Sequence, residues 1–238
     1  MTNNKSVLAW LDEMKELVTP DEVVWIDGSE EQLESLRKQA CETGEMIKLN
    51  QEKLPGCYLH RTAINDVARV EGRTFICSRK EEDAGPTNHW MEPQGAYKML
   101  FNIARGSYKG RTMYVIPYSM GPIGSPLAKI GLEVTDSIYV VLNMAIMTRV
   151  GQAVLDVLGD SEDWVKGLHC KCNSRKRTAI SATSPRTTIS SASTPVTAAT
   201  CCWARSASPC ASPPTRARTR AGWPSTCSSW ALRIPRAR

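Results

Sequence analysis

Arg69 is the residue of this sequence whose type and setting most clearly indicate chemistry. It lies in the run Asp66-Val-Ala-Arg-Val-Glu71, flanked by apolar and acidic residues just before a predicted buried strand. A guanidinium in such a place needs an anion to offset its partial burial. Spacing alone favours a structural ion pair with Asp66 or Glu71 over an anion supplied from outside the chain. Both readings stay open at this point.

The three histidines, His60, His89 and His169, are far apart, and their spacing favours surface or satisfied polar roles over catalysis. His169 stands beside Cys170-x-Cys172, which could suggest zinc. No second pair of ligands follows at the distance that zinc fingers and zinc ribbons use, so we expect no metal site.

The sequence contains no glycine-rich nucleotide-binding pattern, no G-x-S-x-G nucleophile motif and no H-E-x-x-H zinc motif. One loop rich in glycine and proline, 118–126, could bring backbone N–H groups close to an anionic ligand. The same composition could equally form a tight turn between two strands. Neither reading is favoured by the loop alone.

Hydrophobic periodicity predicts the elements that must position these residues. Apolar side chains at helical spacing predict helices over 6–18 and 30–43, and Pro93 and Gly106 bracket a third helix. Ser29 and Gln32 predict a capping box at the start of the second helix. Short apolar runs predict strands at 23–26, 46–49, 57–59, 74–78, 112–118, 132–135 and 139–147. This alternation predicts an α/β fold with a mixed sheet and helices.

The formal net charge of +6 hides two different parts of the chain. Residues 1–168 carry 18 Lys and Arg and all 24 Asp and Glu, whereas residues 169–238 carry 12 Lys and Arg and no carboxylate. Ser, Thr and Ala make up 34 of those last 70 residues. The segment therefore has too few large apolar side chains to build a core. We therefore predict an α/β domain over 1–169 and a disordered, low-complexity basic tail over 170–238.

Cysteine usage and the N-terminus indicate a soluble cytoplasmic protein. Cys41, Cys57 and Cys77 are scattered singly through the acidic part, which suggests a reducing compartment. The N-terminus turns acidic by residue 12 without an apolar core, unlike a signal or transit peptide. No apolar stretch is long enough to predict a membrane span.

Four segments of the acidic part resemble the GTP-dependent phosphoenolpyruvate carboxykinases, in the bacterial branch of that family. The segments are WIDGSEEQ (25–32), DVARVEGRTFICSRKEEDAGPTNHWMEP (66–93), KGRTMYVIPYSMGPIGSPLAKIGLEVTDSIYVVLNMAIMTRVG (109–151) and WVKGLH (164–169). The resemblance covers essentially all of residues 1–169 and is to the amino-terminal domain alone.

The resemblance implies a decarboxylating lyase of gluconeogenesis that converts oxaloacetate and GTP to phosphoenolpyruvate, GDP and carbon dioxide, with manganese and magnesium. It also implies a monomer that acts on small molecules, without nucleic acid or a membrane. Arg69 matches the family's arginine that binds the substrate carboxylate, which favours the ligand over the ion pair. The family's nucleotide, metal and catalytic loops lie beyond the matched segments. We therefore expect no catalytic, cofactor-binding or metal residue in this chain, and no turnover by it.

The tail has the composition that GC-rich coding DNA gives when it is read out of frame. Residues 178–186 can be encoded by bases that give RYISHFPE when read two bases later. At the same offset, 193–200 can read NSGYGGN, 203–213 can read GKKCFALRIA and 223–230 can read AEHMLIL, strings that resemble successive segments of the same family. We hypothesise a frameshift between about Cys170 and Thr178. The alternative is a non-enzymatic α/β module whose basic arm binds nucleic acid or another polyanion.

Overall fold

A computed structural model of the chain describes residues 2–61, 75–77, 80–84, 86 and 89–170, together with the backbone of 199–200 and 229–233. Arg69 and most of the basic tail lie outside the described residues. Within the part that is described, no helix is long and apolar enough to cross a membrane.

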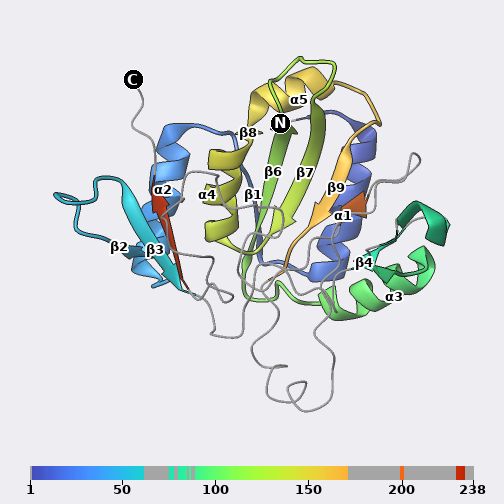
Figure 1. Ribbon diagram of the computed structural model, residues 1–238, viewed down its shortest axis with the longest axis horizontal. Coiled ribbons are helices and arrows are strands. Elements are labelled where there is room, and N and C mark those ends of the chain that lie inside the picture. Colours follow the sequence, from blue (N-terminus) through green and yellow to red (C-terminus); the bar gives the residue numbers. More distant parts are fainter. Residues whose placement is uncertain are drawn as a thin grey trace, which may run out of the picture.

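A mixed sheet forms the centre of the domain, as predicted. Its strands are β1 (Glu22–Trp25), β6 (Thr112–Met120), β7 (Lys129–Thr135), β8 (Arg149–Val150) and β9 (Val165–Leu168). The order is β1-β6-β7-β9, with β8 paired to β6. The β1–β6 and β7–β9 pairs are parallel, whereas β6 runs antiparallel to both β7 and β8. Figure 1 shows these strands side by side between the helices.

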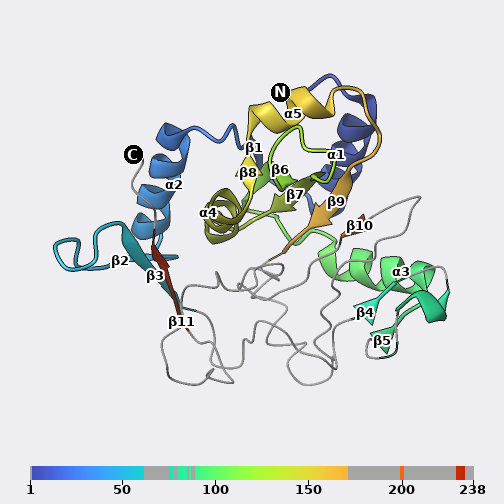
Figure 2. The ribbon, with the colours of Figure 1, turned by 45° about the horizontal axis from the view of Figure 1, so that its top comes forward.

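Helices cover both faces of the sheet (Figures 1 and 2). On one face lie α1 (Lys5–Val18) and α3 (Pro93–Ala104), and on the other lie α2 (Glu30–Glu42) and α4 (Ile138–Met147). A shorter helix, α5 (Gln152–Leu158), follows β8.

The alternation of side chains along β6 explains the three layers. Met113 and Val115 belong to the core cluster that contains α1 and α3. Tyr114, Ile116 and Tyr118 belong to the cluster that contains α2 and α4. Successive side chains of a strand point to opposite faces, so a strand that is apolar at nearly every position is buried on both sides.

The strand predicted at 139–147 is wrong, because these residues form most of helix α4. Ten consecutive, mostly apolar residues carry no amphipathic period, and a buried helix then looks like a buried strand. Helix α5 and strand β9 were not predicted. The other predicted helices and strands are present, with ends shifted by a few residues.

Half of the predicted capping box is confirmed. The backbone N–H of Gln32 donates to Ser29 Oγ over 3.2 Å, which caps α2. The Gln32 side chain does not return to Ser29, as the capping box requires. Its Oε1 accepts instead from the Asp27 N–H over 2.9 Å, and Asp27 Oδ1 accepts from the Ser29 N–H over 2.7 Å.

A smaller sheet projects beside α2. It contains β2 (Ile47–Lys48), β3 (Cys57–Arg61) and β11 (Ser229–Arg233), both partners running antiparallel to β3. Near α3, β4 (Phe75–Ile76) pairs in parallel with β5 (His89–Trp90), and a 3₁₀ helix (Glu81–Ala84) lies between them in the sequence.

Two segments of the tail form backbone pairs with the domain. β11 pairs with β3, and β10 (Ala199–Thr200) pairs with β9 at the edge of the central sheet. The rest of the predicted tail lies outside the described residues, where its disorder stays a prediction.

Asn4 joins the start of α1 to the loop after α5, and its loss should destabilise the domain. Its Oδ1 accepts from the N–H groups of Ser6 and Val7, and its Nδ2 donates to the carbonyl oxygens of Gly159 and Ser161, both over 2.8 Å. We expect Asn4→Ala to lower the free energy of unfolding by about 2 kcal/mol, measured by urea titration. Asn4→Asp keeps the cap but turns a buried carboxylate oxygen toward these two carbonyl oxygens, so it should cost at least as much. Equal stability of Asn4→Ala and the wild type would contradict this reading.

Candidate functional site

The predicted substrate residue, Arg69, lies outside the described residues, as do Asp66, Glu71 and Cys172. The ion-pair reading and the ligand reading of Arg69 are therefore both untested by the structure. The described element that precedes this segment is β3, which ends at Arg61, and the one that follows is β4.

The described part of the chain has a polar cluster where β7 and β9 end. These strands are parallel, so their carboxyl ends meet at one edge of the sheet, the edge at which α/β proteins commonly bind ligands. Thr135 and Asp136 come at the end of β7, and His169 follows β9. All three side chains belong to buried residues.

Buried hydrogen bonds connect this cluster. Thr135 Oγ1 lies 2.8 Å from His169 Nδ1 and accepts from the backbone N–H of Ser137 over 3.1 Å. The Tyr108 hydroxyl donates to the His169 carbonyl oxygen, with the Val134 carbonyl oxygen 3.3 Å away. Every one of these groups is held by another part of the protein. The arrangement therefore ties two strands and a helix start together.

Asp136 contributes a buried carboxylate to this polar cluster. Its side chain is fully buried, and it forms an ion pair with Arg111, which is partly exposed. A buried carboxylate needs such a partner, because an isolated buried charge is very costly. The Asp136 carboxylate is therefore already paired with the Arg111 guanidinium of the same chain.

Burial raises the pKa of Tyr108 well above its usual range, and the nearby Cys170 and Asp136 add to the shift. The folded state thus holds the phenol neutral, as a hydrogen-bond donor. Since the folded pKa lies above the unfolded value of 10.0, the contribution of Tyr108 to stability is complete below pH 10 and is lost as pH rises above it.

Tyr108→Phe should therefore reduce the alkaline loss of stability. We expect the urea midpoint of the wild type to fall between pH 9 and pH 11, and that of Tyr108→Phe to fall by less. Tyr58 and Tyr114 also have raised pKa values through burial, so part of the fall should remain. Identical pH profiles for the two proteins would contradict this assignment.

Residues 118–120 are the last residues of β6, and residues 121–128 form the turn that joins β6 to β7, so the tight-turn reading is confirmed. The N–H of Ser125 donates to the Pro122 carbonyl oxygen over 3.1 Å, and that of Ala128 donates to the Ser125 carbonyl oxygen over 3.0 Å. The N–H of Leu127 donates to Ser125 Oγ over 3.3 Å. These amides are already bonded within the turn, which weakens the anion-binding reading.

The histidines have three different environments. His89 is exposed, and His169 is fully buried and bonded to Thr135. His60 is also buried, 6% exposed, and its Nε2 has no hydrogen-bond partner among the residues that the structure describes. It is therefore neither a surface residue nor a fully satisfied one, contrary to the expectation from spacing. Among the residues with described positions, no His, Cys, Asp and Glu side chains gather as a metal would require.

A groove of about 750 Å³ lies between α2 and the β2–β3 hairpin, and no sequence motif pointed to it. Arg37 lines it and is paired with Glu30 over 2.5 Å and with Glu34 over 2.8 Å. Burial by itself lowers the pKa of Arg37, but hydrogen bonds and charges of the two glutamates outweigh burial and raise it. The cation thus stays paired within α2.

Comparison with known proteins identifies the family. Residues 9–195 match the family described as the phosphoenolpyruvate carboxykinase N-terminal domain. The chain is 53% identical over 178 residues to phosphoenolpyruvate carboxykinase [GTP] of Anaeromyxobacter sp. (strain K), covering 74% of this chain and 30% of that protein. It is 51% identical over 168 residues to the enzyme of the same name from Corynebacterium jeikeium (strain K411), covering 71% of this chain and 28% of that protein.

The chain thus spans about 30% of the length of these relatives. The family match runs past residue 169, where the sequence predicts the end of the domain, and that boundary stays a prediction. A match over most of the chain, on a mixed α/β fold, is what the resemblance of the four segments led us to expect. The chain belongs to the phosphoenolpyruvate carboxykinase family, through its amino-terminal domain.

Proposed function

We propose that this chain represents the amino-terminal part of a GTP-dependent phosphoenolpyruvate carboxykinase. The reaction would convert oxaloacetate and GTP to phosphoenolpyruvate, GDP and carbon dioxide, as a step of gluconeogenesis in the cytoplasm. The observation that carries the proposal is the 53% identity over 178 residues to a protein named for that GTP-dependent activity. The intact enzyme would act as a monomer on small molecules.

In this proposal Arg69 binds a carboxylate of oxaloacetate or phosphoenolpyruvate. A planar guanidinium can donate two parallel hydrogen bonds to a carboxylate, which a lysine ammonium cannot do. Support comes from the DVAR run that ends at Arg69 and lies within the matched residues 9–195. Asp66 and Glu71 would then lie near Arg69 in the sequence without pairing with its guanidinium, which would bind the ligand.

GTP and manganese, with magnesium, would serve the intact enzyme. The described residues do not fit a metal, since they contain no cluster of possible metal ligands, and Asp136 is committed to Arg111. The sequence also lacks a phosphate-binding G-x-x-x-x-G-K-[ST] run. Because the family's nucleotide, metal and catalytic loops lie beyond the matched segments, we propose that the chain, as translated, neither binds these cofactors in the family manner nor turns over.

We further propose that residues from about 170 to 238 are translated out of frame. Two features of the sequence support this: the tail has 12 basic residues without one carboxylate, and a single offset yields four ordered strings of family type. One constant offset that permits four ordered strings is hard to obtain by chance, even with free choice of synonymous codons. The positive charge of the tail would then result from the shifted reading frame and would not reflect selection for binding a polyanion.

Restoring the frame provides the test of the function. The coding sequence is corrected by one insertion or deletion near codon 170 and extended through the rest of the family's length, and the product is assayed with oxaloacetate, GTP and Mn²⁺. We expect formation of phosphoenolpyruvate and GDP by the corrected protein and none by the chain as translated. A folded, corrected protein without activity would overturn the proposal. Salt-sensitive nucleic-acid binding that requires 170–238 would favour the basic-arm alternative.

A further inference from the structure

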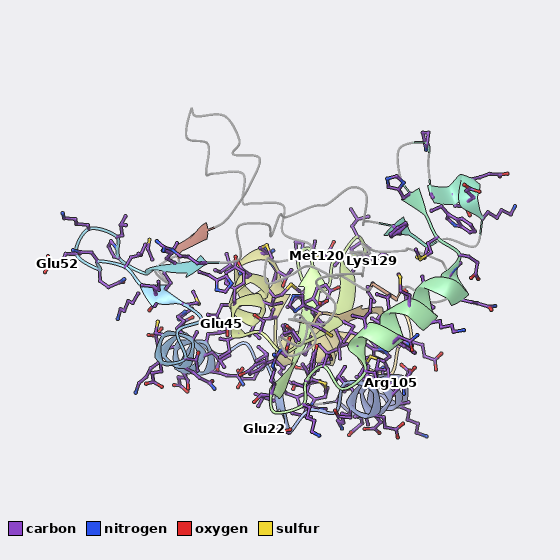
Figure 3. The ribbon with its side chains drawn as sticks, turned by 90° about the horizontal axis from the view of Figure 1, so that it is seen from below. Glu22, Glu45, Glu52, Arg105, Met120 and Lys129 are labelled. Atoms are coloured by element: carbon purple, nitrogen blue, oxygen red, sulfur yellow. The ribbon has the colours of Figure 1, made fainter. Side chains whose placement is uncertain are left out.

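We propose that the outer edge of β1 is a self-association surface that fits the same edge of a second copy of this chain, and that the Gln32 side chain keeps it closed. β1 stands at one end of the described central sheet and pairs there with β6 alone. Figure 3 shows Glu22, where β1 begins, at the periphery of the domain between α1 and α2. An open strand edge presents its N–H and C=O groups to any other strand that approaches.

The register of β1 shows which backbone groups point outward. The N–H that follows the strand, of Ile26, donates inward to the Val115 carbonyl oxygen of β6 over 2.9 Å. Backbone groups of successive residues alternate between the two edges of a strand, so Val23, Trp25 and Asp27 point theirs outward. Residues 23–26 are all β-branched or aromatic, the types that favour strands. This edge is therefore well suited to pair with another strand.

Gln32 occupies the far part of this edge. Its Nε2 donates to the Trp25 carbonyl oxygen over 2.8 Å, and its Oε1 accepts from the Asp27 N–H over 2.9 Å. A side-chain amide carries an accepting oxygen and N–H donors on one planar group. It therefore makes the same two bonds that one residue of a neighbouring parallel strand would make. Two of the outward groups of β1 are thus satisfied from within the chain.

Without Gln32 the edge would be complementary to itself. When two copies approach antiparallel, Val23 of one lies opposite Trp25 of the other, and such a pair exchanges two N–H···O bonds. A two-fold axis near Val24 repeats the pair, so that the dimer is closed. Gln32 prevents this pairing, since its Nε2 already holds the Trp25 carbonyl oxygen on which both pairs depend.

The test removes the amide of Gln32 from the full 238-residue chain and keeps the helix. Gln32→Ala retains the backbone N–H that donates to Ser29 Oγ, and alanine is the best helix former. Gln39→Ala is the matched control, because it makes the same substitution at an exposed position of α2. The double variant Gln32→Ala/Val23→Pro removes an outward N–H from the open edge, because proline has none.

The measurement is the weight-average mass by sedimentation equilibrium, over a range of protein concentrations. We expect the mass of Gln32→Ala to rise with concentration toward about twice that of the wild type. Gln39→Ala should follow the wild type, and the double variant should return to it. Adding a proline would not reverse a general loss of stability, so this return distinguishes edge pairing from partial unfolding.

Two results would overturn the proposal. One is a mass of Gln32→Ala equal to that of the wild type at every concentration. The other is a rise that occurs also in the double variant or in Gln39→Ala, since the association would then use another surface.

Amide exchange in the unaltered chain decides the matter if Gln32→Ala does not fold. The N–H of Asp27 is bonded to Gln32, whereas that of Val23 points outward where no described strand pairs with it. The protection factor of the Asp27 amide should therefore exceed that of the Val23 amide by about tenfold. Equal protection of the two amides would mean that Gln32 does not hold the edge, and the proposal would fail.

Discussion

Replacing Gly151 by alanine should unfold the domain or cost more than about 3 kcal/mol of stability. Gly151 has a φ of 110°, and a Cβ there would overlap the backbone carbonyl of Asp27, lying 2.5 Å from its carbon and 2.9 Å from Gly28 N. The obstruction is backbone, which a rotamer change cannot remove. We expect a large fall in soluble yield and in the urea midpoint.

The contact matters because it joins two turns of the central sheet. The Gly151 N–H donates to the Pro117 carbonyl oxygen over 3.0 Å, and the next N–H, of Gln152, donates to the Asp27 carbonyl oxygen over 3.3 Å. The start of α5 is thereby fixed against the turn between β1 and α2. Any displacement at Gly151 breaks both connections.

Gly159 offers the matched control for this substitution. It also has positive φ, 53°, but a Cβ there would meet no atom of the described residues within 4 Å. Gly159→Ala should therefore cost only the strain of its backbone, φ 53° and ψ −130°, about 1–3 kcal/mol. If Gly151→Ala proves as stable as Gly159→Ala, the close packing of the two turns is wrong.

Replacing Arg69 by lysine in the frame-corrected enzyme should lower kcat/KM for oxaloacetate by about 100-fold, and Arg69→Ala by at least as much. Lysine keeps the positive charge and loses the planar pair of donors that matches a carboxylate. The measurement is the steady-state rate of phosphoenolpyruvate formation, read beside the urea midpoint of each variant.

Arg73→Lys is the control for Arg69→Lys, since Arg73 lies four residues further along, outside the DVAR run. It should leave kcat/KM within a few-fold of the corrected enzyme. If Arg69→Lys instead keeps full activity and loses stability, the arginine serves the ion pair with Asp66 or Glu71. That result would restore the reading that spacing alone favoured.

Much of the fold could be predicted because its signals are local. α1 has an apolar stripe at helical spacing, and its predicted range differs from the observed Lys5–Val18 by one residue at the start. β6 is a long run of β-branched and aromatic residues, and it is the centre of the sheet. α4 was mistaken for a strand because its burial on nearly every side removes the period that distinguishes the two.

The candidate sites could be predicted less completely, because their contacts are not local. Glu45 reaches Ser137 and Tyr139 across 92 and 94 positions of sequence, and no spacing rule connects them. The packing of Gly28 and Gly151 against one another is equally remote in sequence. Arg69 could be singled out by its setting, but its role as a carboxylate ligand came only from the family resemblance.

The coding DNA for residues 170–238 tests the central claim most directly. The claim is that an amino-terminal carboxykinase domain is followed by a tail in the wrong reading frame. We predict that the bases, read at the two-base offset, encode RYISHFPE from codon 178, followed in order by NSGYGGN, GKKCFALRIA and AEHMLIL. Bases that use other synonymous codons, and give no such strings at that offset, would contradict the claim.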